Sequence, residues 1–273
     1  MTTDREGAAQ TANPSGRSSA ENVFITGASS GIGATLARHY AARTANVGLF
    51  ARRADALAAL ASEFDAGRCA TYEGDVRDSS ALDCAAHDFI ARFGAPTVVI
   101  ANAGVSLGAL TERTEDLPVF RAVIETNVIG IVNTFAPFVG VMRAAGGGTL
   151  AGIASVAGFR GLAGSGAYSA SKAAAITYLE SLRLELLDSG IAVVTVCPGY
   201  IATPMTATNP YRMPFLLDPD KAARLIARAI ERRRRFYVLP WQMAIVGFVM
   251  RRLPRPIYDA IFAHAPRKAP HRS

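Results

Sequence analysis

The chain has 273 residues, half of them hydrophobic, and a formal net charge of +7 at neutral pH. That length suits one large α/β domain with an ample core, and we expect no signal peptide at its start. Three cysteines without C-x-x-C spacing argue against a disulfide framework or a zinc site, and Cys197 is expected to lie in the core. The four histidines are scattered along the chain, so no metal is expected.

Apolar runs alternate with helical segments along the chain. Strands are predicted at residues 23–25, 47–50, 70–73, 97–101, 149–154, 192–197 and 236–239. Helices are predicted at 34–43, 54–63, 79–92, 116–144, 167–189 and 219–233, the last capped by Asp218. This alternation predicts an α/β fold with a doubly wound parallel sheet in a single domain. We expect a disordered leader at 1–20, the domain at 21–240, and a C-terminal extension at 241–273.

A glycine-rich turn follows the first predicted strand. The stretch reads Thr26-Gly-Ala-Ser-Ser-Gly-Ile-Gly33, with apolar residues at helical spacing after it. Strand, glycine-rich turn and helix together aim free backbone N–H groups at a pyrophosphate, as in a Rossmann fold. The glycine spacing is G-x-x-x-G-x-G rather than G-x-G-x-x-G, so on its own the segment also fits a chance glycine-rich turn.

A tyrosine and a lysine stand four residues apart in the predicted helix at 167–189. Tyr168 and Lys172 would share one helix face, so the ammonium group could lie close to the phenol. A nearby cation favours the phenolate form, which suits a tyrosine that acts as a general acid or base. Considered alone, the pair is also consistent with two solvated side chains.

The chain resembles the short-chain dehydrogenase/reductases over residues 21–240. The resemblance rests on the motifs Thr26–Gly33, Asn102-Ala-Gly104, Asn127, Ser155, Tyr168-x-x-x-Lys172 and Pro198-Gly199, in that family's order. It implies that Ser155 binds the substrate carbonyl oxygen and that Tyr168 transfers its proton. It also implies that Lys172 assists Tyr168 and binds the nicotinamide ribose. Asn127 would be the helix asparagine beside which the backbone opens to hold a relay water.

The cofactor can be argued from charge at the end of the second strand. An acid there would bind the ribose 2′-OH of NAD(H), but this chain has Arg52 and Arg53 and no carboxylate until Asp55. An arginine can bind a 2′-phosphate, so NADP(H) is favoured over NAD(H); the alternative is that both arginines are merely solvated. The cofactor-binding residues implied by these arguments are Gly27, Ser29, Ser30, Gly31, Ile32, Gly33, Arg52, Arg53, Asp75, Val76, Asn102, Ala103, Gly104, Tyr168, Lys172, Pro198, Gly199, Ile201 and Thr203.

Residues 204–217 occupy the place of the family's mobile lid. They are mostly apolar, which suits a lipophilic substrate, although the same side chains could simply pack the segment down. We therefore expect an oxidoreductase that transfers a hydride between nicotinamide and a carbonyl or secondary alcohol. The alternative is a non-catalytic protein that senses NADP(H) or binds a membrane surface. The resemblance implies a homodimer or homotetramer formed through the two longest helices.

The C-terminal end carries the positive charge of the chain. Residues 221–273 contain 13 lysines and arginines against Glu231 and Asp259, a net charge of +11, so residues 1–220 carry −4. The apolar stretch at 236–250 is shorter than the ~20 residues of a transmembrane helix. Three interpretations stay open: an extension packed on the substrate side or a partner subunit, contact with an anionic membrane surface, or nucleic-acid binding, the least expected. The expected location is the cytoplasm, with or without membrane association.

Overall fold

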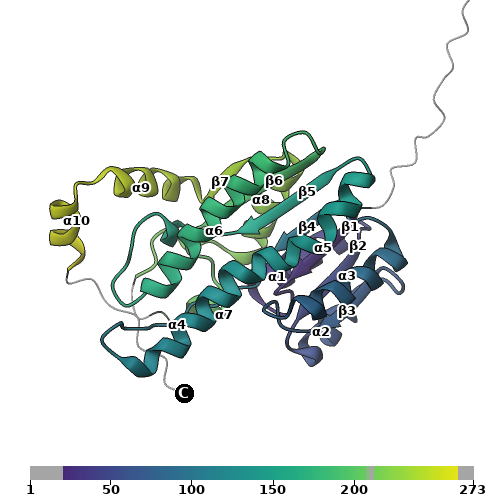
Figure 1. Cartoon of the computed structure of the whole chain (residues 1–273), viewed down its shortest axis with the longest axis horizontal. Coiled ribbons are helices and arrows are strands. Elements are labelled where there is room, and N and C mark those ends of the chain that lie inside the picture. The colour runs from purple at the N-terminus through teal and green to yellow at the C-terminus, as the bar shows by residue number, and fades with distance from the viewer. Residues whose placement is uncertain (1–20, 208, 210–211, 264–273) are drawn as a thin grey trace, which may run out of the picture.

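The computed structural model describes residues 21–207, 209 and 212–263. Its centre is a seven-stranded parallel sheet in the order β3-β2-β1-β4-β5-β6-β7, which confirms the predicted Rossmann fold (Figure 1). The strands are β1 (Asn22–Thr26), β2 (Asn46–Ala51), β3 (Cys69–Glu73), β4 (Val98–Ala101), β5 (Gly148–Ile153), β6 (Ile191–Pro198) and β7 (Phe236–Leu239). The predicted leader at 1–20 lies outside the described residues.

Helices cover both faces of the sheet. One layer comprises α1 (Gly31–Ala41), α2 (Ala54–Ala61) and α8 (Pro219–Glu231). The opposite layer comprises α3 (Ser79–Phe93), α5 (Gly130–Ala144) and α6 (Gly166–Glu185). The predicted cap of α8 is confirmed, because the Asp218 carboxylate accepts a hydrogen bond from the Lys221 backbone N–H at 3.0 Å. The remaining helices are α4 (Leu117–Ile124), α7 (Pro204–Ala207), α9 (Trp241–Arg252) and α10 (Arg255–Phe262).

The five inner strands are almost wholly buried, as expected of a parallel sheet covered on both faces, whereas the edge strands β3 and β7 are partly exposed. Each face of the sheet has its own hydrophobic core, so side chains that alternate along a strand enter different cores. On the side of α3 and α5, the ring of Phe24 meets Phe89 edge-on at 5.4 Å and lies 4.9 Å from Phe138. Cys197 is buried, which confirms the predicted core thiol.

The predicted helix at 116–144 is interrupted by a wider turn. A short 3₁₀ turn (Thr114–Asp116) leads into α4, and a π-helical segment (Glu125–Ile129) joins α4 to α5. Within the described residues, the run Thr114–Ala144 is also the one helix long and apolar enough to cross a membrane, judged by length and composition alone. Here α5 covers one face of the sheet, and that explains its apolar character.

Candidate active site

The glycine-rich turn between β1 and α1 is tightly packed. A Cβ at Gly33 would lie only 2.3 Å from the Gly27 carbonyl oxygen, so the turn tolerates no side chain there. The Asn102 amide holds the turn against the end of β4, donating to the carbonyl oxygens of Thr26 at 3.1 Å and Gly27 at 3.2 Å. No side-chain hydrogen bond caps the N-terminus of α1, so its backbone N–H groups fit a pyrophosphate.

Two arginines follow the end of β2, where the sequence predicts the adenosine ribose. Arg53 donates to the Ser29 hydroxyl at 3.0 Å and so reaches the glycine-rich turn. Arg52 is two-thirds exposed and lies 4.0 Å from an oxygen of Asp75. Asp75 binds Arg77 more closely, at 2.7 Å, and this hydrogen bond lowers the pKa of the carboxyl group. Arg52 is therefore the arginine with the weaker intramolecular contact.

Lys172 lies in the interior of the protein on α6. Its Nζ atom donates to the Ile153 carbonyl oxygen at 2.7 Å and lies 5.9 Å from the centre of the Tyr168 ring. Burial disfavours the charged form and lowers the pKa of Lys172 to about 8. The sequence placed these two residues on one helix face, and the structure adds that the cation is almost fully buried.

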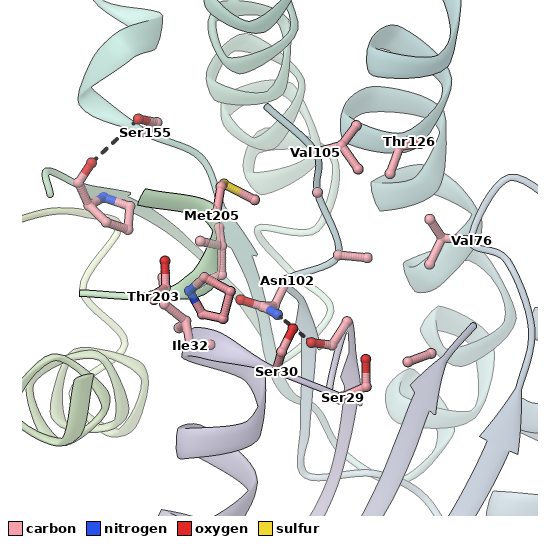
Figure 2. Close-up of a pocket in the computed structure, with 18 of the residues that line it drawn as sticks. Ser29, Ser30, Ile32, Val76, Asn102, Val105, Thr126, Ser155, Thr203 and Met205 are labelled. Carbon is pink, nitrogen blue, oxygen red and sulfur yellow. Dashed lines mark hydrogen bonds between the residues drawn. The ribbon is translucent and has the colours of Figure 1, made fainter. Parts of the chain in front are cut away.

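Ser155 lies just beyond the end of β5, close to Tyr168 and Lys172. It is buried; its hydroxyl accepts from the Ala157 N–H at 3.1 Å and makes a long contact of 3.5 Å to the Pro198 carbonyl (Figure 2). The 3₁₀ turn Val156–Gly158 follows, and Gly158 lets it approach α6, since a Cβ there would lie 2.7 Å from the Lys172 carbonyl carbon. This close approach brings Ser155 to the same pocket as Tyr168 and Lys172.

Asn127 lies at the centre of the π-helical segment and is fully buried. Its amide nitrogen donates to the Val105 carbonyl oxygen and to the Ser171 hydroxyl, both at 2.9 Å, and its oxygen accepts from the Val105 N–H at 2.8 Å. The side chain therefore ties α6 to the loop after β4. A π-helical turn frees backbone groups from their usual partners, which is consistent with the opening that the family resemblance implies at this position.

These elements surround one cavity of about 520 Å³ at the carboxyl ends of the strands (Figure 2). All the predicted catalytic and cofactor-binding residues line it except Gly33 and Asn127, which act through packing and hydrogen bonds behind its wall. Sequence reasoning assigned no site role to several other lining residues, most of which are direct neighbours of motif positions. These are Ala51, Gly74, Val105, Thr126, Ile153 and Ala154, whereas Pro204, Met205 and Thr206, which also line the cavity, belong to the segment predicted as a lid.

Known proteins match both the sequence and this arrangement. Residues 21–212 match the short chain dehydrogenase family. The chain belongs to this family. An uncharacterised oxidoreductase of Myxococcus xanthus is 38% identical over 240 residues, which cover 87% of this chain and 94% of that protein.

Solved structures of the family superpose well on this chain. A short-chain dehydrogenase from Streptomyces avermitilis does so with a TM-score of 0.76 and 30% identity, covering 90% of this chain and 95% of its own. An actinorhodin polyketide ketoreductase variant solved with NADPH gives a TM-score of 0.73 and 27% identity, over 80% of this chain and 95% of that one. The protein is therefore an NAD(P)-dependent oxidoreductase of the short-chain dehydrogenase type.

The segment expected to act as a lid divides into two parts. Met205 lines the cavity from α7, whereas Leu217 is buried in the core and exchanges backbone hydrogen bonds with Tyr200 and Ala202. Phe215 and Leu216 are both 48% exposed. Residues 208, 210 and 211 of the predicted lid lie outside the described residues. Leu217 therefore packs in the core beneath the site, whereas Met205 brings an apolar side chain to the cavity.

Proposed function

We propose that this short-chain dehydrogenase uses NADP(H) to interconvert a lipophilic carbonyl compound and the corresponding secondary alcohol. The observation that carries the proposal is the arrangement of Ser155, Tyr168 and the buried Lys172 around one cavity. The bound nicotinamide would supply or accept the hydride. The residues of the chain would then handle the proton and hold the substrate.

Each of these residues has a chemical role in the proposal. The Ser155 hydroxyl would bind the substrate oxygen, since its contact to Pro198 is long and easily exchanged. Tyr168 would give its proton to that oxygen during reduction and take it back during oxidation. Lys172 would supply positive charge from a buried position near Tyr168, and this favours the phenolate form of Tyr168. Asn127 would act as a positioning residue, because its amide holds α6 to the loop after β4.

The preference for NADP(H) rests on Arg52. Its guanidinium is largely exposed beside the cavity, with one contact to Asp75 at 4.0 Å, so it can turn to a 2′-phosphate. The polyketide ketoreductase that superposes on this chain was solved with NADPH, which supports the same choice. We expect the protein in the cytoplasm, where both forms of this cofactor are available.

Replacing Arg52 with aspartate should move the preference from NADPH towards NADH. A charge-assisted hydrogen bond is worth ~1.5–3 kcal/mol, so the ratio of the two dissociation constants should change by about 10- to 100-fold or more. Fluorescence titration of both cofactors measures this ratio. Arg224→Asp, an equal charge change at an exposed position of α8, should leave the ratio as it is. An unchanged ratio in Arg52→Asp would show that Arg52 does not bind the 2′-phosphate.

The substrate class can be tested with a series of ketones and aldehydes of increasing chain length. NADPH oxidation should rise with chain length, because Met205 and the apolar wall of the cavity gain contact with a longer substrate. Protein carrying Tyr168→Phe serves as the blank. Turnover that falls with chain length while short polar carbonyls react would contradict the lipophilic assignment.

We propose a homodimer or homotetramer that forms through the exposed apolar side chains of α4 and α6. Leu117 is 65% exposed and Leu184 is 55% exposed, and both would be buried by a second copy. Sedimentation of the protein at several concentrations, compared with a Leu184→Glu variant, tests this arrangement.

A further inference from the structure

The last two helices, α9 and α10, present an exposed apolar surface that the catalytic function does not use. On α9 the exposed side chains recur at spacings of three and four residues and therefore share one helix face. Two more lie four residues apart on α10. We call this surface the α9–α10 stripe; its six residues are between 50% and 67% exposed: Trp241, Ile245, Phe248, Val249, Ile257 and Ile261.

The other face of α9 is fixed to the wall of the catalytic cavity. Met243 packs on Gly199, where a Cβ would lie 2.7 Å from its Cγ, and Gly247 lies against the ring of Phe159. Gly199 lines the cavity, and Phe159 follows the turn after Ser155. The stripe therefore cannot turn inward to cover itself, because the inward face of α9 is already occupied.

The Arg160 side chain and the backbone of Gly161, in the loop after that turn, hold the end of α9 and the Tyr258 side chain of α10. Arg160 donates to the carbonyl oxygens of Met250 and Leu253 at 3.3 and 3.1 Å, and its guanidinium lies 4.1 Å from the centre of the Tyr258 ring. The Tyr258 hydroxyl donates to the Gly161 carbonyl oxygen at 2.7 Å. These contacts fix α10 in place, and Figure 1 shows both helices extending beyond the sheet.

Positive charge borders the stripe. Arg251, Arg252 and Arg255 lie between its two parts, and Asp259 is the only acid in residues 241–273. The guanidinium of Arg252 lies 3.6 Å from the centre of the Phe248 ring, so a cation sits directly beside an exposed apolar side chain. Residues 264–273 add two arginines and one lysine to the sequence and no acid. Apolar side chains beside a cluster of arginines are complementary to an anionic lipid surface.

The length of α9 decides whether these helices would lie on a membrane surface or cross the membrane. Twelve residues of helix span about 18 Å, well short of the ~30 Å hydrocarbon core of a bilayer. Arg251 and Arg252 are the last residues of α9, and Pro254 separates this helix from α10. The helices can therefore lie in the plane of the interface but cannot cross it. Trp241 lies at the start of α9, and tryptophan is one of the residue types enriched at that depth.

We propose that α9 and α10 form an anchor that lies on an anionic membrane, with the α9–α10 stripe inserted at the boundary between headgroups and acyl chains. A second copy of the chain is the less favoured occupant, because a symmetric contact through the stripe would bring the arginines of both copies together. The anchor would hold the cavity beside the bilayer through Gly199 and Phe159. Membrane binding itself does not depend on the proposed catalytic function.

The only tryptophan of the chain, Trp241, lies in the stripe and provides a direct measurement. With full-length protein, vesicles of phosphatidylcholine and phosphatidylglycerol should shift its emission to shorter wavelength. Phosphatidylglycerol brominated on the acyl chains should quench it. Vesicles of phosphatidylcholine alone should have much less effect, and soluble glycerol phosphate none. Binding to the free headgroup without quenching by brominated chains would overturn the proposal.

A matched pair of variants separates membrane insertion of the stripe from the effect of the added negative charge. Ile245→Glu with Phe248→Glu should lower the vesicle-bound fraction by at least about tenfold, because the stripe loses its apolar centre. Ala58→Glu with Ala59→Glu adds the same charge at exposed positions of α2 and should bind as the unchanged protein does. Equal loss in both variants, or a blue shift that depends on protein concentration without vesicles, would refute membrane insertion. Circular dichroism checks that all variants are folded.

Discussion

Replacing Tyr168 with phenylalanine should abolish turnover while leaving NADPH binding nearly unchanged. The ring would keep its place on α6, but no hydroxyl would be left to exchange a proton with the substrate oxygen. General acid–base catalysis contributes about 10²- to 10⁴-fold, so kcat should fall by at least two orders of magnitude. Steady-state NADPH oxidation gives kcat, and cofactor fluorescence gives the dissociation constant.

Tyr178 supplies the control for this experiment. It is a second tyrosine of α6, half-buried against the core between the helices and the sheet, and it does not line the cavity. Tyr178→Phe should therefore retain full activity. If Tyr168→Phe retained more than a tenth of the activity, another group would have to carry the proton, and the acid–base assignment of Tyr168 would fail.

The burial of Lys172 predicts a dependence of stability on pH. The pKa of this group is 10.5 in the unfolded chain and about 8 in the folded protein. Between these values the unfolded state binds more protons, so the free energy of unfolding rises with pH. Below about pH 8 the buried ammonium group lowers the free energy of unfolding by its full amount. This destabilisation disappears as the pH rises towards 10.5. A pKa shift of this size corresponds to a change of about 3 kcal/mol in the free energy of unfolding.

Comparison with Lys172→Met isolates this contribution. The variant fills a similar volume without a charge, so its stability should lack this part of the pH dependence. Urea unfolding near pH 7 and near pH 10 gives both free energies, and the unchanged protein should gain about 2–3 kcal/mol relative to the variant. Lys221→Met, at an exposed position of α8, should show no such difference. A constant difference between the unchanged protein and Lys172→Met would mean that Lys172 is solvated or uncharged at neutral pH.

Local sequence was sufficient to predict the order of the strands and the main helices up to β7, but it did not predict α7, α9 and α10 or the π-helical break in the helix expected at 116–144. The apolar runs of β1 and β2 each follow an asparagine, and α1 and α2 begin within a few residues of the ends of these strands, whereas α4 begins only at Leu117, well after β4 ends at Ala101. The cap at Asp218 also follows from its immediate neighbours, and the structure confirms it. These features depend on residues close together in the chain, and so the sequence can predict them.

The pairing of Tyr168 with Lys172 was predicted in the same way, because one helical turn separates the two residues. The Ser155 and Asp75 positions came instead from the resemblance to the family, and the Arg52 position came from its charge at the end of the second predicted strand. That all of them line one cavity is decided by the strand order of the sheet, which brings the carboxyl ends of β3, β2, β1, β4, β5 and β6 side by side. The roles proposed for them remain predictions that the variants above can test.

The sequence by itself determined the family and the fold, and it predicted most of the residues that line the cavity. Only the tertiary structure decided how those residues are held. Lys172 is buried where α6 meets the end of β5, at the Ile153 carbonyl oxygen, and Asn127 in the π-helical turn bonds to Val105 and to Ser171 of α6. The basic C-terminal end left three interpretations open, since helical spacing alone cannot tell which face is covered. Arg160, 90 residues before its partner Met250, settles which face of α9 meets the body and leaves the α9–α10 stripe outside.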